Sequence, residues 1–423
     1  MGDTILSGTV PADTEAPLLA GPATQPSPVA SPLSAYDRWL VGLLRRALGG
    51  PALRVVLGDA EPIALSSEPP VADLVVQDRR ALLSILIDPD LRFGDEYVAG
   101  RVDIRGDLLA ALLAVYGSWN DGTRAGGRDR LRRRGGNTVR RSREDIHHHY
   151  DIGNDFYRLW LDEEMVYTCA YFDPPEADLE AAQRAKMEYV CRKLRLRPGE
   201  TVLETGCGWG ALALHMARRH GVTVRACNLS REQVRFARER ARREGLEGRV
   251  EFVEADYREM TGRYDAFVSV GMLEHVGPAY YPSLAAVMDR CLREDGRGLL
   301  HFIGRDRPGP LSAWIRRRIF PGAYPPTVAE VAYAVLEPAG LSVLDVENLR
   351  LHYARTLAHW RSRFESAWEK VTAMFDLSFA RTWRLYLAGS EAAFISGWLQ
   401  LFQVTFARSG HNALPWTRAD LYR

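Results

Sequence analysis

Three glycines within five positions follow a short apolar run in the segment VLETGCGWGALA, residues 202–213. Gly206, Gly208 and Gly210 have no Cβ, so they permit a tight turn, an open approach for a ligand, and close contact between the next helix and a sheet. The spacing E-x-G-x-G-x-G is neither the G-x-G-x-x-G of dinucleotide sites nor the G-x-x-x-x-G-K-[ST] of phosphate loops. A tight turn without any ligand is the alternative interpretation.

Polar side chains follow the next two strands that the sequence predicts. Asn228, Ser230 and Gln233 come after the segment VTVRACN, where ribose hydroxyls of a bound nucleoside would lie. Asp256 and Tyr257 come after RVEFVEA and offer an acceptor for an adenine amino group beside an aromatic face. Together these residues describe a site for a nucleoside without phosphates, and S-adenosylmethionine fits that description.

The elements that must position these residues alternate in type from about Glu144 onward. Apolar strands too short to be helices alternate with helices up to Gly304, which predicts an α/β fold with a doubly wound, mostly parallel sheet covered on both faces. In such a sheet, ligands bind beyond the carboxyl ends of the strands, where the glycine turn falls. After Gly304 we expect one more strand at residues 341–349 and long helices from Thr356 to Phe406.

The chain before this sheet has three parts. Residues 1–32 are rich in Pro, Ala, Ser and Gly without periodicity, which predicts a disordered tail. Residues 33–119 predict a small α+β domain. Its expected elements are helices at 35–48, 79–87 and 108–116, strands at 53–57 and 72–76, and turns with a strand across 94–107.

A basic linker spans residues 120–144, with nine arginines between Arg124 and Arg143 and four glycines among them. It is either a solvated linker or a contact for anionic lipid headgroups. Nucleic acid is disfavoured, because the linker has no interleaved aromatic residues and the whole chain carries a net charge of only +1.

Cysteine usage and hydropathy indicate the compartment. The five cysteines form no CxxC pair, which favours reduced thiols in a cytoplasm over disulfides or a zinc site. His147, His148 and His149 are consecutive, so in a helix they would point about 100° apart and could not converge on one ion. No apolar run reaches about 18 residues, and the N-terminus has neither a signal peptide nor a myristoylation pattern. We predict a cytoplasmic protein with no metal and, at most, peripheral membrane contact.

Nine sequence blocks resemble the cyclopropane-fatty-acyl-phospholipid synthases and the related cyclopropane synthases of mycolic acids. They occur in order across about residues 145–410. The blocks are HYDIGNDFY, MVYTCAYF, ETGCGWG, LSREQ, ADYRE, SVGMLEHVGP, LLHFIG, IFPGAYPP and LHYARTLAHW.

The resemblance implies a methyltransferase catalytic domain at 145–423, of the class I S-adenosylmethionine-dependent type, with helical insertions at the lipid site. It implies transfer of a methylene unit to the double bond of a phospholipid acyl chain, through a carbocation with bicarbonate as base. It also implies that the N-terminal domain at 33–119 binds lipid, that the enzyme lies at the inner face of the membrane, and that it forms a homodimer. The catalytic residues implied are Glu274, His301, Tyr353, Cys169 and Ile303, the last two through their backbone. The cofactor-binding residues implied are Tyr167, Thr168, Gly206, Cys207, Gly208, Gly210, Asn228, Leu229, Gln233, Asp256 and Tyr257.

Aromatic faces stabilise cations, and Tyr167, Phe172, Phe302 and Tyr353 are the candidates for that role. Leu273 and Phe302 depart from the family pattern, as do Thr168 and Asn228 more conservatively. A changed distribution of aromatic bulk around the cation would favour a methylene- or methyl-branched product over a ring. Two further functions stay open at this point, namely methylation of a small amine and a non-catalytic lipid-binding role.

Overall fold

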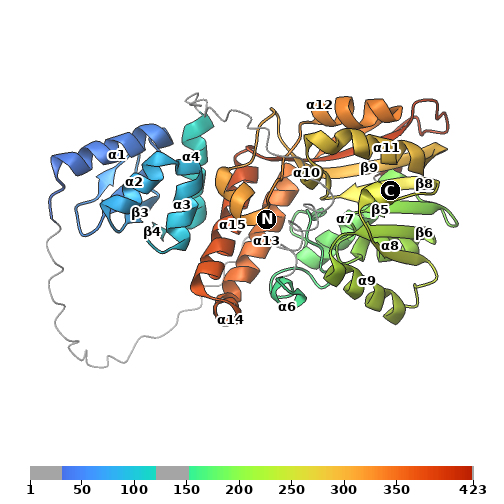
Figure 1. Ribbon diagram of the computed structural model, residues 1–423, viewed down its shortest axis with the longest axis horizontal. Coiled ribbons are helices and arrows are strands. Elements are labelled where there is room, and N and C mark those ends of the chain that lie inside the picture. Colours follow the sequence, from blue (N-terminus) through green and yellow to red (C-terminus); the bar gives the residue numbers. More distant parts are fainter. Residues whose placement is uncertain (1–30, 121–151, 422–423) are drawn as a thin grey trace, which may run out of the picture.

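The computed structural model describes residues 31–120 and 152–421 (Figure 1). Most of the predicted disordered tail, nearly all of the basic linker, and the run from His147 to His149 lie outside the described residues. Among those described, no helix combines the length and the apolar character needed to cross a membrane.

The N-terminal unit, residues 31–120, is a four-stranded sheet of order β2-β1-β3-β4 with helices packed against it. Residues 89–98 form a helix, whereas the sequence analysis expected turns and a strand from residue 94. Pro89 at the first position and Asp90 in the first turn favour that helix. The elements are α1 (Ala35–Leu48), β1 (Leu53–Leu57), β2 (Ile63–Ala64), β3 (Ala72–Val76), α2 (Arg79–Ile87), α3 (Pro89–Val98), β4 (Val102–Gly106) and α4 (Leu108–Asn120).

The second unit is built on a seven-stranded sheet of order β10-β11-β9-β8-β5-β6-β7. All its strands are parallel except β11, which is antiparallel to both neighbours. This confirms the mostly parallel sheet that the sequence predicts. The strands are β5 (Thr201–Thr205), β6 (Thr223–Asn228), β7 (Val250–Glu254), β8 (Tyr264–Val270), β9 (Leu292–Gly304), β10 (Leu341–Asn348) and β11 (Gln400–Arg408).

Helices cover both faces of this sheet. One core contains side chains of α11 with Tyr264 and Phe267 of β8, and the other contains side chains of α7, α8 and α9 with Ala266, Val268 and Val270 of β8. The helices are α6 (Asn154–Tyr157), α7 (Leu179–Leu194), α8 (Ala211–His220), α9 (Arg231–Arg243), α10 (Leu273–Val276), α11 (Tyr281–Cys291) and α12 (Val328–Val331).

Strand β11 corrects the prediction that residues up to Phe406 are helical. The predicted helices before it are present as α13 (Arg350–Ser366), α14 (Trp368–Met374) and α15 (Leu377–Ile395). The side chains of β11 are buried on both faces: Phe402, Val404 and Phe406 pack in the core that contains α11, and Leu401 packs in the core that contains α13 and α15. A continuous apolar run of this kind does not show the two-residue periodicity that identifies a half-buried strand.

Helices α13–α15 lie between the sheet and the N-terminal unit (Figure 1). The Ala313 N–H donates to Asp90 Oδ2 at 2.6 Å, and Arg381 Nε donates to the Tyr97 carbonyl at 2.7 Å. A Cβ built at Gly94 would lie 2.4 Å from the Trp314 ring, so α3 has a glycine where this indole packs. The two units therefore share a specific interface.

Candidate active site

The glycine turn lies at the carboxyl end of β5, and the surroundings of its middle glycine differ from those of the outer two. All three have positive φ, at 79° for Gly206, 53° for Gly208 and 85° for Gly210. A Cβ at Gly206 would lie 2.9 Å from Met272 Cβ, and one at Gly210 would lie 2.6 Å from the Phe252 ring. A Cβ at Gly208 would meet nothing within 4 Å among the described residues. The middle glycine thus borders open space, whereas the outer two allow close packing.

Polar residues from the neighbouring strands surround this space. Asn228 Nδ2 donates to Gln233 Oε1 at 2.6 Å and to the Gly208 carbonyl at 3.3 Å. Its own Oδ1 accepts from the Leu229 N–H at 2.8 Å, which fixes the end of β6 beside the glycine turn. Within the described chain, the buried Gln233 Nε2 and Tyr257 hydroxyl have no hydrogen-bond partner. Unpaired buried polar atoms next to an open space fit a bound nucleoside.

Asp256, the expected acceptor for an adenine amino group, is fully buried and engaged by another residue. Arg258 Nε donates to Asp256 Oδ1 and Arg258 Nη2 to Asp256 Oδ2, each at 2.7 Å. The Asp256 carboxylate is therefore held in place by Arg258. An adenine amino group would have to donate to one of the remaining lone pairs of the Asp256 carboxylate.

The segment containing Tyr167, Thr168 and Cys169 is held by two buried side chains of α7 that the sequence analysis missed. Gln183 Nε2 donates to the Thr168 carbonyl at 2.8 Å, and Lys186 Nζ donates to Thr168 Oγ1 at 3.1 Å. Burial lowers the pKa of Lys186 to about 8. Nothing in the sequence signals this role, because polar residues on a helix are ordinarily solvated.

The five implied catalytic residues come from four segments of the chain and line one cavity. Glu274 is on α10 after β8, His301 and Ile303 are on β9, Tyr353 is on α13, and Cys169 is in the segment described above. Glu274 Oε1 lies 3.4 Å from the Ile303 N–H, which donates to it. Glu274 Oε2 and His301 Nε2 are buried atoms with no partner among the residues described.

The protonation state of His301 follows from its neighbours. Lys193 Nζ donates to Gln403 Oε1 at 2.6 Å, which orients the amide so that Gln403 Nε2 donates to His301 Nδ1 at 3.0 Å. Burial, reinforced by the charges of Lys186 and Lys193, lowers the pKa of His301 far below its ordinary value. The imidazole is therefore neutral and carries its proton on Nε2, which has no partner among the described residues.

Burial also raises the pKa of Glu274 to about 7, because the side chain is only 6% exposed and its hydrogen bond from the Ile303 N–H offsets little of that effect. Burial raises the pKa of the Cys169 thiol as well, and its Sγ donates to the Ala170 carbonyl. A buried, protonated thiol fits a packing role for Cys169 and is unsuited to nucleophilic attack.

Of the aromatic candidates, Tyr167 and Tyr353 line the cavity. Phe302 instead packs with Phe402 in the core on the other side of β9, because strand residues alternate between faces and His301 and Ile303 face the cavity. Phe172 stacks on His359 and is not part of the cavity wall. Leu273 is likewise buried in the core with Phe302.

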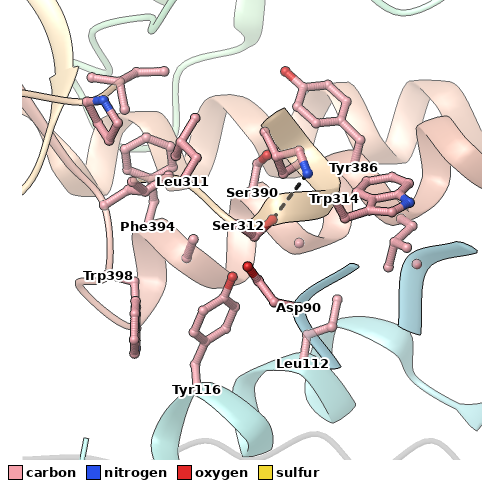
Figure 2. Close-up of a pocket in the computed structure, with 18 of the residues that line it drawn as sticks. Asp90, Leu112, Tyr116, Leu311, Ser312, Trp314, Tyr386, Ser390, Phe394 and Trp398 are labelled. Carbon is pink, nitrogen blue, oxygen red and sulfur yellow. Dashed lines mark hydrogen bonds between the residues drawn. The ribbon is translucent and has the colours of Figure 1, made fainter. Parts of the chain in front are cut away.

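The cavity has a volume of about 650 Å³ and extends from these residues into the N-terminal unit. Near the glycine turn its wall includes Tyr167, Thr168 and Gly271. At the other end it passes between α4 and the core of the N-terminal unit, where Leu44, Leu74 and Leu112 line it. Figure 2 shows Asp90, Leu112 and Tyr116 facing side chains that include Tyr386, Ser390 and Phe394 of α15. The wall is mainly apolar, with few polar groups, as expected for a small-molecule site.

Comparisons with known proteins find similar chains. The family described as "Mycolic acid cyclopropane synthetase" matches residues 137–404. A probable fatty acid methyltransferase of Pseudomonas putida is 38% identical over 383 residues, covering 88% of this chain and 96% of the relative. The cyclopropane-fatty-acyl-phospholipid synthase of Escherichia coli K12 is 40% identical over 267 residues, covering 63% of this chain and 68% of the relative.

Two solved structures are similar to the chain at TM-scores of 0.60. One is the cyclopropane synthase MmaA2 of Mycobacterium tuberculosis, at 30% identity, with 63% of this chain and 98% of that chain covered. The other is the mycolic acid cyclopropane synthase CmaA1 complexed with SAH and CTAB, at 29% identity with the same coverage. The glycine turn, the sheet order and these matches together show that the chain belongs to the mycolic acid cyclopropane synthetase family and is an S-adenosylmethionine-dependent methyltransferase.

Proposed function

We propose that the enzyme adds a methylene unit across the double bond of an unsaturated phospholipid acyl chain and forms a cyclopropane ring. The observation that carries this proposal is the long apolar cavity that reaches Glu274 and His301, whose buried polar atoms have no partner in the described chain. An acyl chain matches the apolar wall. A buried acid beside a buried neutral imidazole matches a reaction that must remove one proton in a dry site.

S-adenosylmethionine supplies an electrophilic methyl group on a sulfonium. An alkene is a weak nucleophile with no proton to lose before attack, so the protein must mainly align it and exclude water. The bond from sulfur to the methyl carbon breaks as the alkene carbon bonds to that methyl. The cation left on the adjacent carbon is then flanked by the aromatic side chains of Tyr167 and Tyr353, which line this part of the cavity.

Ring closure needs a proton to leave the new methyl group, so that its bonding electrons close the three-membered ring. We propose that Glu274, His301, Tyr353, and the backbone near Cys169 and Ile303 hold bicarbonate at this point. Such an anion would supply a proton acceptor small enough to lie between apolar walls. In this proposal the Nε2–H of His301 donates to the anion and Glu274 Oε2 orients its proton, since both atoms are buried and have no partner among the described residues.

The product distinguishes this proposal from the alternative of a branched chain. That alternative has some support, since the Pseudomonas relative is named a fatty acid methyltransferase and another relative is a tuberculostearic acid methyltransferase of Mycobacterium tuberculosis. However, Leu273 and Phe302, the departures that would redistribute aromatic bulk, both lie in a core away from the cavity. The cavity wall itself thus gives no reason for a changed product.

With a trideuterated methyl donor and unsaturated phospholipid vesicles, we expect a product that keeps two deuterium atoms per added carbon and resists hydrogenation under conditions that spare the ring. A methylene-branched alkene would keep two deuterium atoms but take up hydrogen. Retention of all three deuterium atoms, measured by mass spectrometry, would contradict proton loss from the transferred methyl group. Loss of activity in bicarbonate-depleted buffer, restored by added bicarbonate, is the expected sign of the proposed base.

The N-terminal unit supplies part of the acyl-chain site in this proposal, so filling its end of the cavity should impair the lipid substrate alone. We expect Leu112→Trp to lower kcat/KM for phospholipid about tenfold or more, because overpacking costs about 1–3 kcal/mol, and to leave cofactor affinity unchanged. Leu113→Trp is the matched control on the same helix, since Leu113 does not line the cavity. Equal kinetics for the two variants would exclude the N-terminal unit from the acyl-chain site.

A phospholipid substrate also requires contact with the membrane. We propose that the enzyme binds the inner face peripherally and that the arginine-rich linker contributes through attraction to anionic headgroups. Replacing Arg132, Arg133, Arg134, Arg140 and Arg141 by Gln should then reduce sedimentation with anionic vesicles at low salt and leave neutral vesicles unaffected. Unchanged sedimentation would mean that the linker only connects the two units.

A further inference from the structure

Three side chains of metal-binding type meet between α7 and α8, outside the cavity described above, and a carboxylate contacts two of them. Cys191, His215 and His220 each offer one ligand atom, and these three atoms lie within 4.8 Å of one another. Glu188 Oε2 lies 3.1 Å from His215 Nε2 and 3.3 Å from His220 Nε2. No step of the proposed reaction uses any of these residues.

The two helices bring these residues together. Glu188 and Cys191 are three residues apart on α7, so they share one face of that helix. His215 lies within α8 and His220 is its last residue, followed by Gly221 in the left-handed conformation that ends the helix. The Cys191 side chain is fully buried, whereas those of His215, His220 and Glu188 are 12%, 17% and 36% exposed. The cluster is therefore open to solvent on the side of Glu188, which gives an ion a way in.

The donor set and its spacing suit one kind of ion. A thiolate, two imidazoles and a carboxylate are the ligands of four-coordinate Zn²⁺, with bonds of about 2.0–2.3 Å. In a tetrahedral shell, bonds of that length place neighbouring nitrogen and oxygen ligands about 3.3 Å apart. The distances from Glu188 to both histidines are already close to this value. Hard cations such as Mg²⁺ or Ca²⁺ would instead require an all-oxygen shell.

We propose that Glu188, Cys191, His215 and His220 bind one Zn²⁺ that cross-links α7 to α8. The sequence analysis predicted no metal, because it searched for short ligand spacings, and here the two halves of the site are separated by β5 and the glycine turn. All four protein positions are filled in this arrangement, which is typical of a structural ion. Loss of the ion is therefore expected to affect stability before chemistry.

An ion at this position would affect the arrangement of the active site. Helix α8 begins directly after Gly210, and α7 carries Gln183 and Lys186, which hold Thr168. An ion bound by both helices would fix the glycine turn relative to the segment containing Tyr167, Thr168 and Cys169. The alternative is a hydrogen-bonded cluster in which Glu188 accepts from both imidazoles and no ion is needed.

The full chain, with any affinity tag removed and treated with a chelator, should be titrated with Co²⁺ as a spectroscopic substitute for Zn²⁺. We expect one equivalent to give the intense visible bands of a tetrahedral ion together with a thiolate-to-cobalt charge-transfer band, and Zn²⁺ to abolish both. The charge-transfer band separates this site from the three consecutive histidines at 147–149, which offer no thiol. Added Zn²⁺ should also raise Tm, because it binds the folded state.

Two variants and one control decide the outcome. Cys191→Ser should remove the charge-transfer band. His215→Gln, on a partly exposed side chain, should weaken binding about a hundredfold or more, and it serves as the test if the variant at the buried cysteine does not fold. Cys291→Ser, at another buried cysteine far along the chain, should bind the ion as the parent does. A charge-transfer band that survives Cys191→Ser, or a parent protein that shows only octahedral Co²⁺ and no rise of Tm with Zn²⁺, would overturn the proposal.

Discussion

Glu274→Gln is expected to lower turnover by about 10²–10⁴-fold while S-adenosylmethionine binds with unchanged affinity, because the damaged proton step follows binding. The substitution keeps the shape of the side chain and its contact with the Ile303 N–H. It removes the ionisable oxygen that has no partner among the described residues. Single-turnover rates and isothermal titration calorimetry measure the two quantities separately. A variant with parental turnover would exclude Glu274 from the reaction.

The same substitution should change the pH dependence of both activity and stability. In the parent enzyme, burial raises the pKa of Glu274 to about 7, so the fraction of Glu274 that is ionised falls as the pH falls through 7. Because the ionised form orients the proton acceptor, kcat/KM should fall with it. A carboxyl whose pKa is raised on folding costs stability when ionised, and this cost grows between its unfolded pKa near 4.5 and about 7. Glu274→Gln should therefore raise Tm at pH 8 and have little effect on Tm near pH 4.5. A lower Tm at pH 8 would show that the carboxylate is stabilised by contacts other than those described.

Gly208→Val is expected to reduce S-adenosylmethionine affinity about 5- to 150-fold, since overpacking against a ligand costs about 1–3 kcal/mol. The space beside this residue is open, with none of the described atoms within 4 Å of a Cβ placed there, whereas the space at Gly206 and Gly210 is occupied by neighbouring side chains. A branched side chain would fill the volume that the ligand needs. Calorimetric titration with S-adenosylhomocysteine avoids turnover during the measurement.

Gly245→Val is the matched control for backbone strain. Gly245 has a φ of 67° and, as at Gly208, none of the described atoms lies within 4 Å of a Cβ, but it lies in the turn after α9. Both variants should lose similar stability, because a β-branched residue is strained at positive φ. Only Gly208→Val should lose affinity. Equal affinities would move the cofactor site away from the glycine turn.

The glycine turn and the parallel sheet could be predicted from the sequence because their signals are local. Gly206, Gly208 and Gly210 directly follow an apolar strand, and the strand order then places them at the ligand-binding edge. The catalytic residues could be proposed only through resemblance. Glu274, His301 and Tyr353 are far apart in the chain, and no periodicity indicates that β9, α10 and α13 meet at one cavity.

Other features depended on tertiary packing. Strand β11 was predicted as helix because burial on both faces removed its alternation. The placement of Phe302 near the cation could have been rejected in advance, since adjacent strand residues face opposite sides and His301 was assigned to the site. Gln183 and Lys186 were missed because a polar residue on a helix is ordinarily solvated, and only the fold shows that these two are buried.

Strand β11 also has a consequence for how the chain acquires its shape during synthesis. It is the last of the described strands to leave the ribosome, yet it occupies an interior place in the sheet and lies between β9 and the edge strand β10. Until residue 408 has emerged, β9 and β10 present open edges that other nascent chains can pair with. Because β9 must also wait for a partner about a hundred residues downstream, this contact of high sequence separation should make assembly slow. Protection from aggregation is therefore needed most in the interval between the synthesis of β9 and the release of the completed chain.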